Sequence, residues 1–140
     1  MLLKLEKAFT LIELLVVISI IGILTTLVFA NLNAARQRAR DAQRKSDLRN
    51  ISTALRLYYS DNARYPASIN FGEAWELNDI EYMTLIPDDP LSPNQSYSYV
   101  YDEFEDSYQL EACMENKSDS NCDLNAELGD CAGCIFLMIP

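Results

Sequence analysis

Histidine is absent from this 140-residue chain, and glycine occurs only four times. A chain without histidine has no Ser-His-Asp triad and lacks the commonest general base of enzymes. The few glycines do not form the glycine-rich loop that holds phosphate groups in nucleotide-binding proteins. We therefore do not expect an enzyme.

Proline is absent before Pro66, so nothing earlier in the chain prevents a long helix. A continuous helix from Phe9 to Tyr59 would be about 75 Å long, which a chain of this size cannot bury alone. Beyond the first 30 residues, apolar positions recur every three or four residues, as one helix face requires. They are Leu32, Ala35, Ala39, Ala42, Leu48, Ile51, Leu55 and Tyr58. Charged residues fill the gap between Ala42 and Leu48, so this face is predicted to rotate or weaken there.

Charge is scarce between Phe9 and Ala30, where Glu13 is the only ionisable residue. The run is long enough to cross a bilayer, which takes about 20 residues. A carboxylate near the centre of a span costs roughly 2.5 to 3.5 kcal/mol, and such acids usually find a counter-charge. The run contains no basic residue, so the partner of Glu13 is predicted to come from another chain or from a terminus created by processing.

The residues around Glu13 form a pattern: a short basic leader, the small residue Ala8, then Phe-Thr-Leu-Ile-Glu and a long hydrophobic stretch. This pattern resembles the class III signal of type IV pilins and type II secretion pseudopilins. The resemblance implies that a prepilin peptidase cuts between Ala8 and Phe9 and methylates the new amine. It also implies that the Phe9 amine of one subunit pairs with Glu13 of its neighbour during assembly. Most relatives carry glycine before the cut, so Ala8 is expected to slow processing.

The same resemblance implies an α+β, pilin-like fold, in which a long N-terminal helix, transmembrane in its first half, packs on a small antiparallel sheet. The predicted organisation is a leader peptide (1–8), a transmembrane and assembly helix (9–30), an amphipathic helix (31–60) and a head with a cysteine-rich C-terminal region (61–140). The implied function is that of a structural subunit of a type IV pilus or a type II secretion pseudopilus, which polymerises with itself through its N-terminal helix.

The implied partners besides other subunits are the prepilin peptidase, an inner-membrane assembly platform and, before assembly, membrane lipid. The implied location is the inner membrane, crossed once, with the head periplasmic or extracellular, followed by a filament. The positive-inside rule disagrees, because it would place the basic segment after Ala30 in the cytoplasm. We follow the family topology, since the leader must face its cytoplasmic peptidase.

Other interpretations stay open on the residues alone. Lys4, Lys7 and the apolar run could form an ordinary secretory signal that ends with Val28-Phe29-Ala30. The run could also anchor an envelope binding protein that does not polymerise, or an anchored CxxC redox protein. Which of these the chain is depends on whether the N-terminal helix is kept and used for packing.

Basic residues are almost absent from the second half of the chain. Residues 1–64 carry ten Lys or Arg and five acids, whereas residues 65–140 carry only Lys117 and sixteen acids. The basic run could contact nucleic acid phosphates; it consists of Arg36, Arg38, Arg40, Arg44, Lys45 and Arg49. We favour contact with the acidic heads of neighbouring subunits, because Asp41 and Asp47 interrupt the run. Nucleic acid is therefore not an expected partner.

After Tyr59 the composition is that of a small polar head, and local signals divide it into segments. In chain order these are a helix end at 60–62, a short helix or irregular connector packed on the stalk at 67–86, a proline-rich rigid loop at 86–94, strands at 97–101 and 107–113 around an acidic turn, and a short third strand at 135–139. The loop resembles the Asp-Pro stretch before the sheet of major pseudopilins, with Leu91 where an aromatic residue is more common.

Cysteine is absent until Cys113 and then occurs four times, also at Cys122, Cys131 and Cys134. We expect two disulfides, because a head of this size benefits from covalent links in an oxidising compartment. An antiparallel third strand would bring Cys113 to Cys134 and leave Cys122 for Cys131, although all three pairings remain open. The alternatives are a redox pair at Cys131-Ala-Gly-Cys134 and a zinc site.

Calcium is the remaining metal question, because major pseudopilins of this type hold the ion with oxygen ligands in a late loop. The candidate carboxylates are Asp102, Glu103, Glu105, Asp106, Asp119, Asp123 and Asp130. None of them follows a fixed-spacing calcium loop, and so acidic a head shows carboxylates everywhere. We favour a solvated acidic surface, with no metal or cofactor and with calcium as the alternative.

Overall fold

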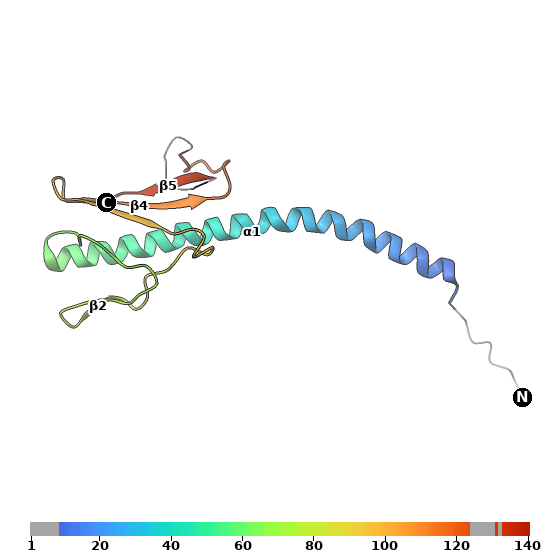
Figure 1. The fold of residues 1–140 in the computed structure, drawn as a ribbon, viewed down its shortest axis with the longest axis horizontal. Coiled ribbons are helices and arrows are strands. Elements are labelled where there is room, and N and C mark those ends of the chain that lie inside the picture. The colour runs from blue at the N-terminus through green and yellow to red at the C-terminus, as the bar shows by residue number, and fades with distance from the viewer. Residues whose placement is uncertain (1–8, 124–130, 132) are drawn as a thin grey trace, which may run out of the picture. The chain divides into compact units, whose positions relative to one another are not determined.

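The structure is a computed structural model that describes residues 9–123, 131 and 133–140. The chain divides after Arg36 into an N-terminal unit and a C-terminal unit. One helix, α1 (Leu11–Asn62), contributes to both units. The strands of the described residues all belong to the C-terminal unit (Figure 1). They are β1 (Trp75–Leu77), β2 (Ile80–Met83), β3 (Ser98–Asp102), β4 (Ser107–Met114) and β5 (Cys134–Met138). The predicted α+β class is confirmed.

The N-terminal unit is an exposed apolar stretch of α1. Its exposed large apolar side chains range from 81% exposure at Leu11 to 37% at Leu32. The most apolar window of α1 has a mean hydropathy of 2.7, and none of it is buried. By length and composition this part of α1 can therefore cross a membrane, as predicted. The predicted leader, residues 1–8, lies outside the described residues.

In the C-terminal unit, α1 buries positions three or four residues apart, namely Asp41, Arg44, Leu48, Ile51, Leu55 and Tyr58. The apolar face is thus confirmed from Leu48 to Tyr58. The prediction is wrong for the earlier part of this face, because Ala35, Ala39 and Ala42 are exposed. The face does not weaken in the charged gap either, since Asp41 and Arg44 continue it at the same spacing.

The end of α1 agrees with the predicted stop at residues 60–62. Ala63 adopts a left-handed conformation with a φ of 54°, and its backbone N–H donates to the Tyr59 carbonyl at 2.8 Å. Such a residue satisfies one of the free carbonyls at a helix end and turns the chain away.

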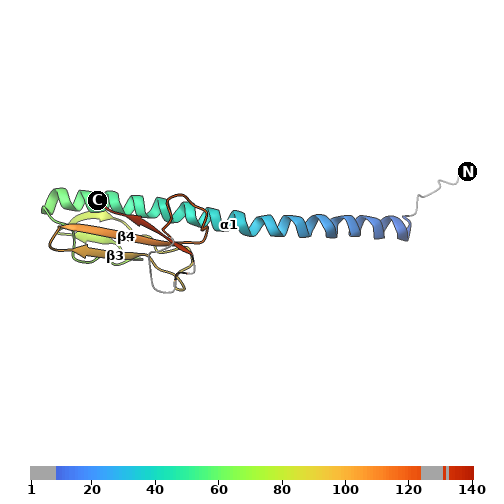
Figure 2. The same ribbon diagram turned by 90° about the horizontal axis from the view of Figure 1, so that it is seen from above.

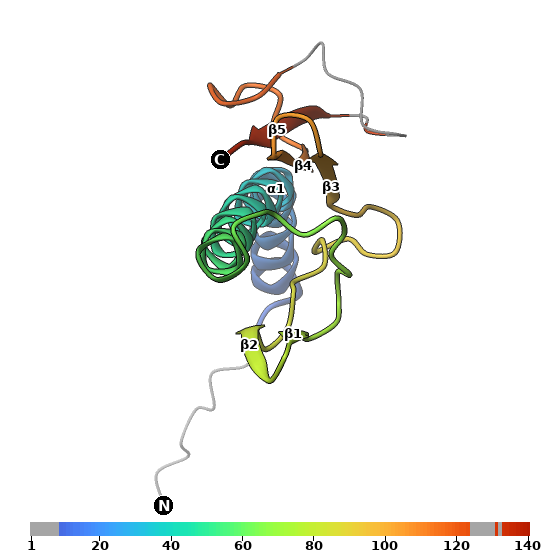
Figure 3. The same ribbon diagram turned by 90° about the vertical axis from the view of Figure 1, so that its left-hand side faces the viewer.

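β3, β4 and β5 form an antiparallel sheet in that order. Figures 2 and 3 show this sheet beside the C-terminal half of α1. The predicted hairpin and third strand are confirmed, within one residue at the ends. The core between helix and sheet consists of Leu48, Ile51, Leu55, Tyr65, Ile86, Tyr97, Tyr108, Leu110, Ala112, Met114, Cys134 and Phe136.

β1 and β2 form a second, two-stranded hairpin inside the segment 67–86, so the helix predicted as one option for that segment is wrong. The turn residues Asn78 and Asp79 have φ angles of 51° and 64°, which suit a tight hairpin turn. The predicted packing on the stalk is confirmed, because the Trp75 ring stacks on Tyr58 of α1 with 5.3 Å between centroids. Figure 3 shows the hairpin and the three-stranded sheet on different sides of α1.

Candidate functional site

The start of α1 is closed by a reciprocal pair of side chains, Thr10 and Glu13. The Glu13 Oε2 atom accepts from the Thr10 backbone N–H at 2.9 Å and from the Thr10 hydroxyl at 2.7 Å. In return the Glu13 backbone N–H donates to the Thr10 hydroxyl oxygen at 3.3 Å. This arrangement is a capping box, which satisfies N–H groups that the first helical turn leaves free.

The capping box gives Glu13 neutral hydrogen-bond donors and leaves the prediction of a counter-charge untested. The Glu13 carboxylate has donors within its own chain, so it does not depend on another chain for every hydrogen bond. Both donors are neutral, however, and no described residue forms an ion pair with Glu13. The spacing Thr-x-x-Glu was visible in the sequence and signals this motif. The negative charge of Glu13 is therefore not neutralised by a cation among the described residues.

The other predicted processing residues are placed only in part. Phe9 lies at the start of the described chain with 77% of its surface exposed. Ala8 lies outside the described residues. The pairing of Phe9 with Glu13 of a neighbouring subunit involves two copies of the chain and stays a prediction.

Arg44 is the centre of a buried ionic cluster, which we define as Arg44, Asp41, Asp89, Gln95 and Glu115. The guanidinium is completely buried, and Asp41 and Asp89 are each 3% exposed. Its five N–H groups all have acceptors, as a buried guanidinium requires. The bonds are Nε to Asp89 Oδ2 (2.7 Å), Nη2 to Asp89 Oδ1 (3.0 Å), Nη2 to Gln95 Oε1 (3.0 Å), Nη1 to Asp41 Oδ1 (2.8 Å) and Nη1 to Glu115 Oε1 (3.0 Å).

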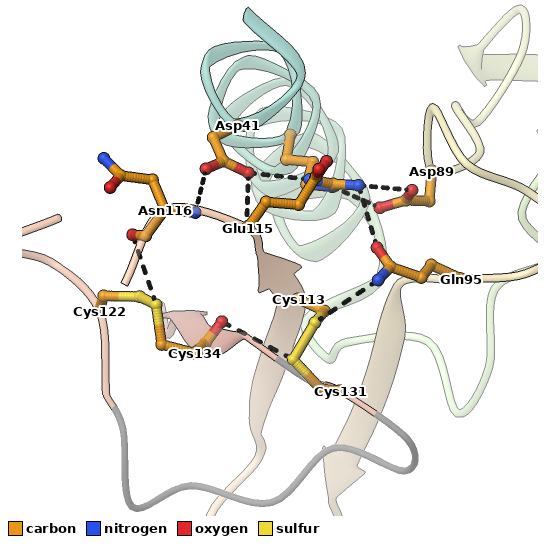
Figure 4. Close-up of a disulfide and its surroundings, with 10 residues drawn as sticks. Asp41, Asp89, Gln95, Cys113, Glu115, Asn116, Cys122, Cys131 and Cys134 are labelled. Carbon is orange, nitrogen blue, oxygen red and sulfur yellow. Dashed lines mark hydrogen bonds and ion pairs between the residues drawn. A yellow bond between two sulfur atoms is a disulfide. The ribbon is translucent and has the colours of Figure 1, made fainter. Parts of the chain in front are cut away.

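The cluster joins three separate parts of the C-terminal unit. Figure 4 shows Asp41, Asp89, Gln95 and Glu115 converging from α1, the proline-rich loop and the end of β4. Asp41 also accepts from the backbone N–H groups of Glu115 and Asn116 at 3.0 and 2.8 Å, so it caps the end of β4. The cluster therefore fixes the loop and the sheet on the helix.

Two members of the cluster, Arg44 and Glu115, have shifted pKa values that favour their charged forms. Burial alone would lower the pKa of Arg44, but the hydrogen bonds and charges of Asp89, Glu115 and Asp41 outweigh it and raise that pKa above its ordinary value. The hydrogen bond from Arg40 lowers the pKa of Glu115, and Arg44 adds to this effect. Arg44 and Glu115 are therefore both charged at neutral pH.

The structure corrects our interpretation of three residues of the basic run, namely Arg40, Arg44 and Lys45. Arg40 donates two hydrogen bonds to Glu115, each 2.6 Å long, and Lys45 donates one to Asp119 at 2.5 Å. With Arg44, these cations are held by acids of their own chain, so they are available neither to nucleic acid nor to a neighbouring head. Sequence reasoning treated them as surface charges because, apart from Asp41, their acidic partners lie at least 45 residues away.

Both disulfides form, and no cysteine is free. Our favoured pairing was wrong, because the bonds are Cys113–Cys131 and Cys122–Cys134 (Figure 4). The reason is strand register. Cys134 lies opposite Met114, one position beyond Cys113, and successive side chains of a strand point to opposite faces of the sheet.

The alternatives for these cysteines are contradicted by the same bonds. Cys131 and Cys134 belong to different disulfides, so they do not form a CxxC redox disulfide, and no thiolate is left for zinc. Gly133 between them passes so close to Met114 that a Cβ atom there would overlap the Met114 carbonyl oxygen. A glycine is therefore required at this position.

Several of the carboxylates considered as candidate calcium ligands have other partners. Asp102 accepts from the backbone N–H groups of Phe104 and Glu105. Asp106 accepts from the Tyr65 backbone and from the Tyr101 hydroxyl, and Asp119 is bound by Lys45. Asp130 lies outside the described residues. Within the described part of the chain, no group of three or more potential ligands gathers at one point.

Comparison with known proteins gives one family match and several relatives. The model of the prokaryotic N-terminal methylation motif matches residues 3–29. Type II secretion system core protein G of Aeromonas hydrophila is 35% identical over 108 residues, which cover 64% of this chain and 76% of that protein. Core protein G of Pseudomonas aeruginosa is 28% identical over 138 residues, which cover 89% of this chain and 94% of that protein.

Other matches are shorter. The type IV major pilin protein PilA of Myxococcus xanthus is 36% identical over 60 residues, 43% of this chain and 27% of that protein. The chain spans less than half the length of several curated relatives that it matches, for example 40% of core protein G of Pectobacterium carotovorum. No solved structure gives a significant match.

Proposed function

Since the chain belongs to the family of type II secretion system core protein G, we propose that it is the filament-forming subunit of a type II secretion pseudopilus. A prepilin peptidase removes residues 1–8 and methylates the amine of Phe9. The processed chain then polymerises through the N-terminal part of α1. In this role the protein acts by assembly, without catalysis and without a cofactor.

One observation carries the proposal: an N-terminal methylation motif covers the first part of α1, where the apolar side chains are exposed and Glu13 is the only ionisable residue between Leu11 and Phe29. Apolar surface of this extent is stable only in lipid or against other protein. A membrane supplies the first environment and copies of the same helix supply the second. The chain can therefore be stored in the membrane and drawn into a filament without exposing the helix to water.

The charge of Glu13 gives this assembly its register. The capping box supplies neutral donors to the carboxylate, and a cation is still missing. Cleavage before Phe9 creates an amine four residues before Glu13, so each subunit carries one cation and one anion near its N-terminus. An ion pair in a low-dielectric environment is valuable mainly because the unpaired groups are costly, and it therefore favours one register over others.

The membrane orientation and the partners belong to the same proposal. The leader faces the cytoplasm, where it meets the peptidase, and the head lies outside the inner membrane. That compartment is oxidising, which suits the two disulfides of the head. An inner-membrane assembly platform and surrounding lipid are the further partners.

A type IV pilus is the second candidate, and the similarity to PilA favours it. We place it second because the matches to core protein G extend over 108 and 138 residues, against 60 for PilA. The two candidates share processing and polymerisation and differ in what the filament moves. A neighbouring secretin gene and a secreted hydrolase would favour the pseudopilus, whereas a retraction ATPase would favour the pilus.

The test is the N-terminus and assembly of the full chain in cells that contain a prepilin peptidase and an assembly platform. Wild-type filaments should consist of a chain that begins at methylated Phe9, as read by mass spectrometry. Glu13→Gln keeps a hydrogen-bonding side chain but removes the charge, so it should be cleaved and yet reduce filament yield by at least about tenfold. A mature N-terminus at Asn31, or normal filaments from Glu13→Gln, would contradict the proposal.

A further inference from the structure

The outer face of the three-stranded sheet, which points away from α1, carries exposed apolar side chains. We define it as Val100, Phe104, Gln109, Glu111 and Leu137, with Val100 opposite Gln109 and Glu111 opposite Leu137. Val100 is 52% exposed, Leu137 is 47% exposed and Phe104, in the turn between β3 and β4, is 102% exposed. Ile139, directly after β5, is 58% exposed. A hollow of about 340 Å³ lies between Val100, Phe104 and Gln109.

This outer face is acidic as well as apolar. The segment 98–114, which contains β3, the turn and β4, has five acids and no Lys or Arg, and β5 has no charged residue. Hydrogen bonds fix the conformation of the turn. The Asp102 carboxylate accepts from two backbone N–H groups of the turn, and the Asp106 carboxylate accepts from the Tyr65 backbone N–H and the Tyr101 hydroxyl. Phe104 is thus held outward with Glu103 and Glu105 beside it.

A complementary surface exists on the same chain. We define the arginine stripe as Arg38, Arg49 and Arg56, which are exposed residues of α1 in the C-terminal unit. Their spacings of 11 and 7 residues are close to three and two full turns at 3.6 residues per turn, so the three side chains lie on one flank of the helix. None of them forms an ion pair within the described part of the chain.

The two surfaces also match in length. Arg38 and Arg56 are 18 residue steps apart along the helix, or about 27 Å at 1.5 Å per residue. β4 has eight residues, which extend about 27 Å at 3.4 Å per residue. A helix lying along the sheet can therefore place its arginines beside the acids of the turn before β4 and beside Glu111 within β4.

We propose that the outer face of the sheet in one subunit binds the arginine stripe of α1 in a second copy of the chain. This inference rests on the proposed function and adds the surfaces through which heads recognise each other. The two surfaces are different parts of one molecule, so the contact is heterologous and leaves a free surface of each kind at the two ends. A contact of this type continues without closing, as a filament requires.

The contact combines two kinds of interaction. Arginine keeps its charge at the tip of an aliphatic stem, so the stem packs on Val100 and Leu137 while the guanidinium reaches the acidic rim. Phe104 offers a ring face to a guanidinium, an arrangement that adds a cation–π attraction. Charge attraction between exposed groups is screened by salt, so assembly of heads should weaken as ionic strength rises.

The test exchanges the charges of the two surfaces in the full chain. The stripe variant is Arg49→Glu/Arg56→Glu, which leaves Arg38 intact because Arg38 lines a small hollow with Asp41 and Asp119. The face variant is Glu103→Lys/Glu111→Lys. The matched control is Glu76→Lys/Glu81→Lys, which makes the same charge change on an exposed pair of the β1–β2 hairpin.

Each single-surface variant should reduce filament yield by about tenfold, because like charges then meet across the contact. The combination of both variants should recover at least half of the wild-type yield, since opposite charges face each other again. The control should assemble like wild type. Retained disulfides, seen as unchanged mobility without reductant, confirm that each variant is folded.

The outcomes separate this inference from the proposed function. If wild type forms no filament, the proposed function fails. If wild type assembles and Glu13→Gln does not, but the face or stripe variant assembles normally, the function stands and the docking surfaces are wrong. Folded single-surface variants that lose assembly without recovery in the combination also overturn the inference. So does a stripe variant that loses only DNA binding, because the stripe then serves nucleic acid.

Discussion

Arg44 shows how one charged side chain can organise a small head. A completely buried guanidinium is costly to desolvate, and it is tolerated here because all five of its N–H groups have acceptors. Its bonds reach residues as far as 71 positions away. The acceptors would be left buried without a partner if Arg44 were removed, so its value lies in the groups that it satisfies.

We therefore expect Arg44→Ala to lower the free energy of unfolding of the head by about 3 to 5 kcal/mol, the usual cost of breaking a buried ion pair. Arg49→Ala is the matched control, an exposed arginine on the same helix without an ion pair, and it should change stability by less than about 0.5 kcal/mol. Denaturant unfolding of the full chain in detergent, followed by circular dichroism, measures both. Equal losses in the two variants would contradict the role assigned to the cluster.

At the scale of elements, the register between β4 and β5 decides the disulfide pairing. Cys113 and Cys134 are close along the paired strands, but they point to opposite faces of the sheet. Cys134 therefore turns inward and is 2% exposed, and it bonds with Cys122. A shift of one residue in register would reverse this choice.

Paired cysteine variants test the register directly. Cys113→Ser/Cys131→Ser removes one whole bridge and should leave the other intact, with no free thiol detected by alkylation and a loss of stability of about 2 to 4 kcal/mol. Cys113→Ser/Cys134→Ser removes the same number of cysteines but breaks both bridges, so Cys122 and Cys131 should appear as free thiols. The reverse pattern would show that the pairing first favoured from the sequence is correct.

At the scale of the whole molecule, the strongly acidic second half is matched in part by cations of α1. Glu115 accepts hydrogen bonds from Arg40 and Arg44, and Asp119 accepts one from Lys45. These bonds lower the pKa of the Glu115 carboxyl below its ordinary value of 4.5 and that of the Asp119 carboxyl below 3.8. A carboxyl group whose pKa is lowered by folding stabilises the fold above its ordinary pKa. That contribution is lost as the pH falls toward the lowered value.

The comparison of wild type with Glu115→Gln should reveal this loss without interference from the other acids. Near neutral pH, wild type should be more stable, because only the charged Glu115 pairs with Arg40 and Arg44. Below pH 4.5 the difference should shrink, since protonated Glu115 then resembles glutamine. Thermal melting of both proteins from pH 7 to acidic pH measures the difference. A constant gap over this range would mean that Glu115 is not ionised in the folded head.

The sequence by itself determined the elements that depend on neighbouring residues. The methylation motif, the apolar run around Glu13 and the absence of proline before Pro66 specified the helix. The alternating residues on each side of the turn 102–106 specified the hairpin. Even the capping box was readable, because Thr10 and Glu13 are three residues apart. Such signals act within one turn or one strand, so they need no knowledge of the fold.

Only the tertiary structure decided which distant residues meet. Arg44 and Asp89 are separated by 45 residues, and nothing near Arg44 in the chain distinguishes it from the exposed Arg49. Cysteine pairing likewise followed from the register of two strands, which a single residue changes. The β1–β2 hairpin is held by its stacking on Tyr58 of α1. Burial and charge compensation are properties of the packed chain, because the partners that make a buried charge tolerable come together only when the head folds.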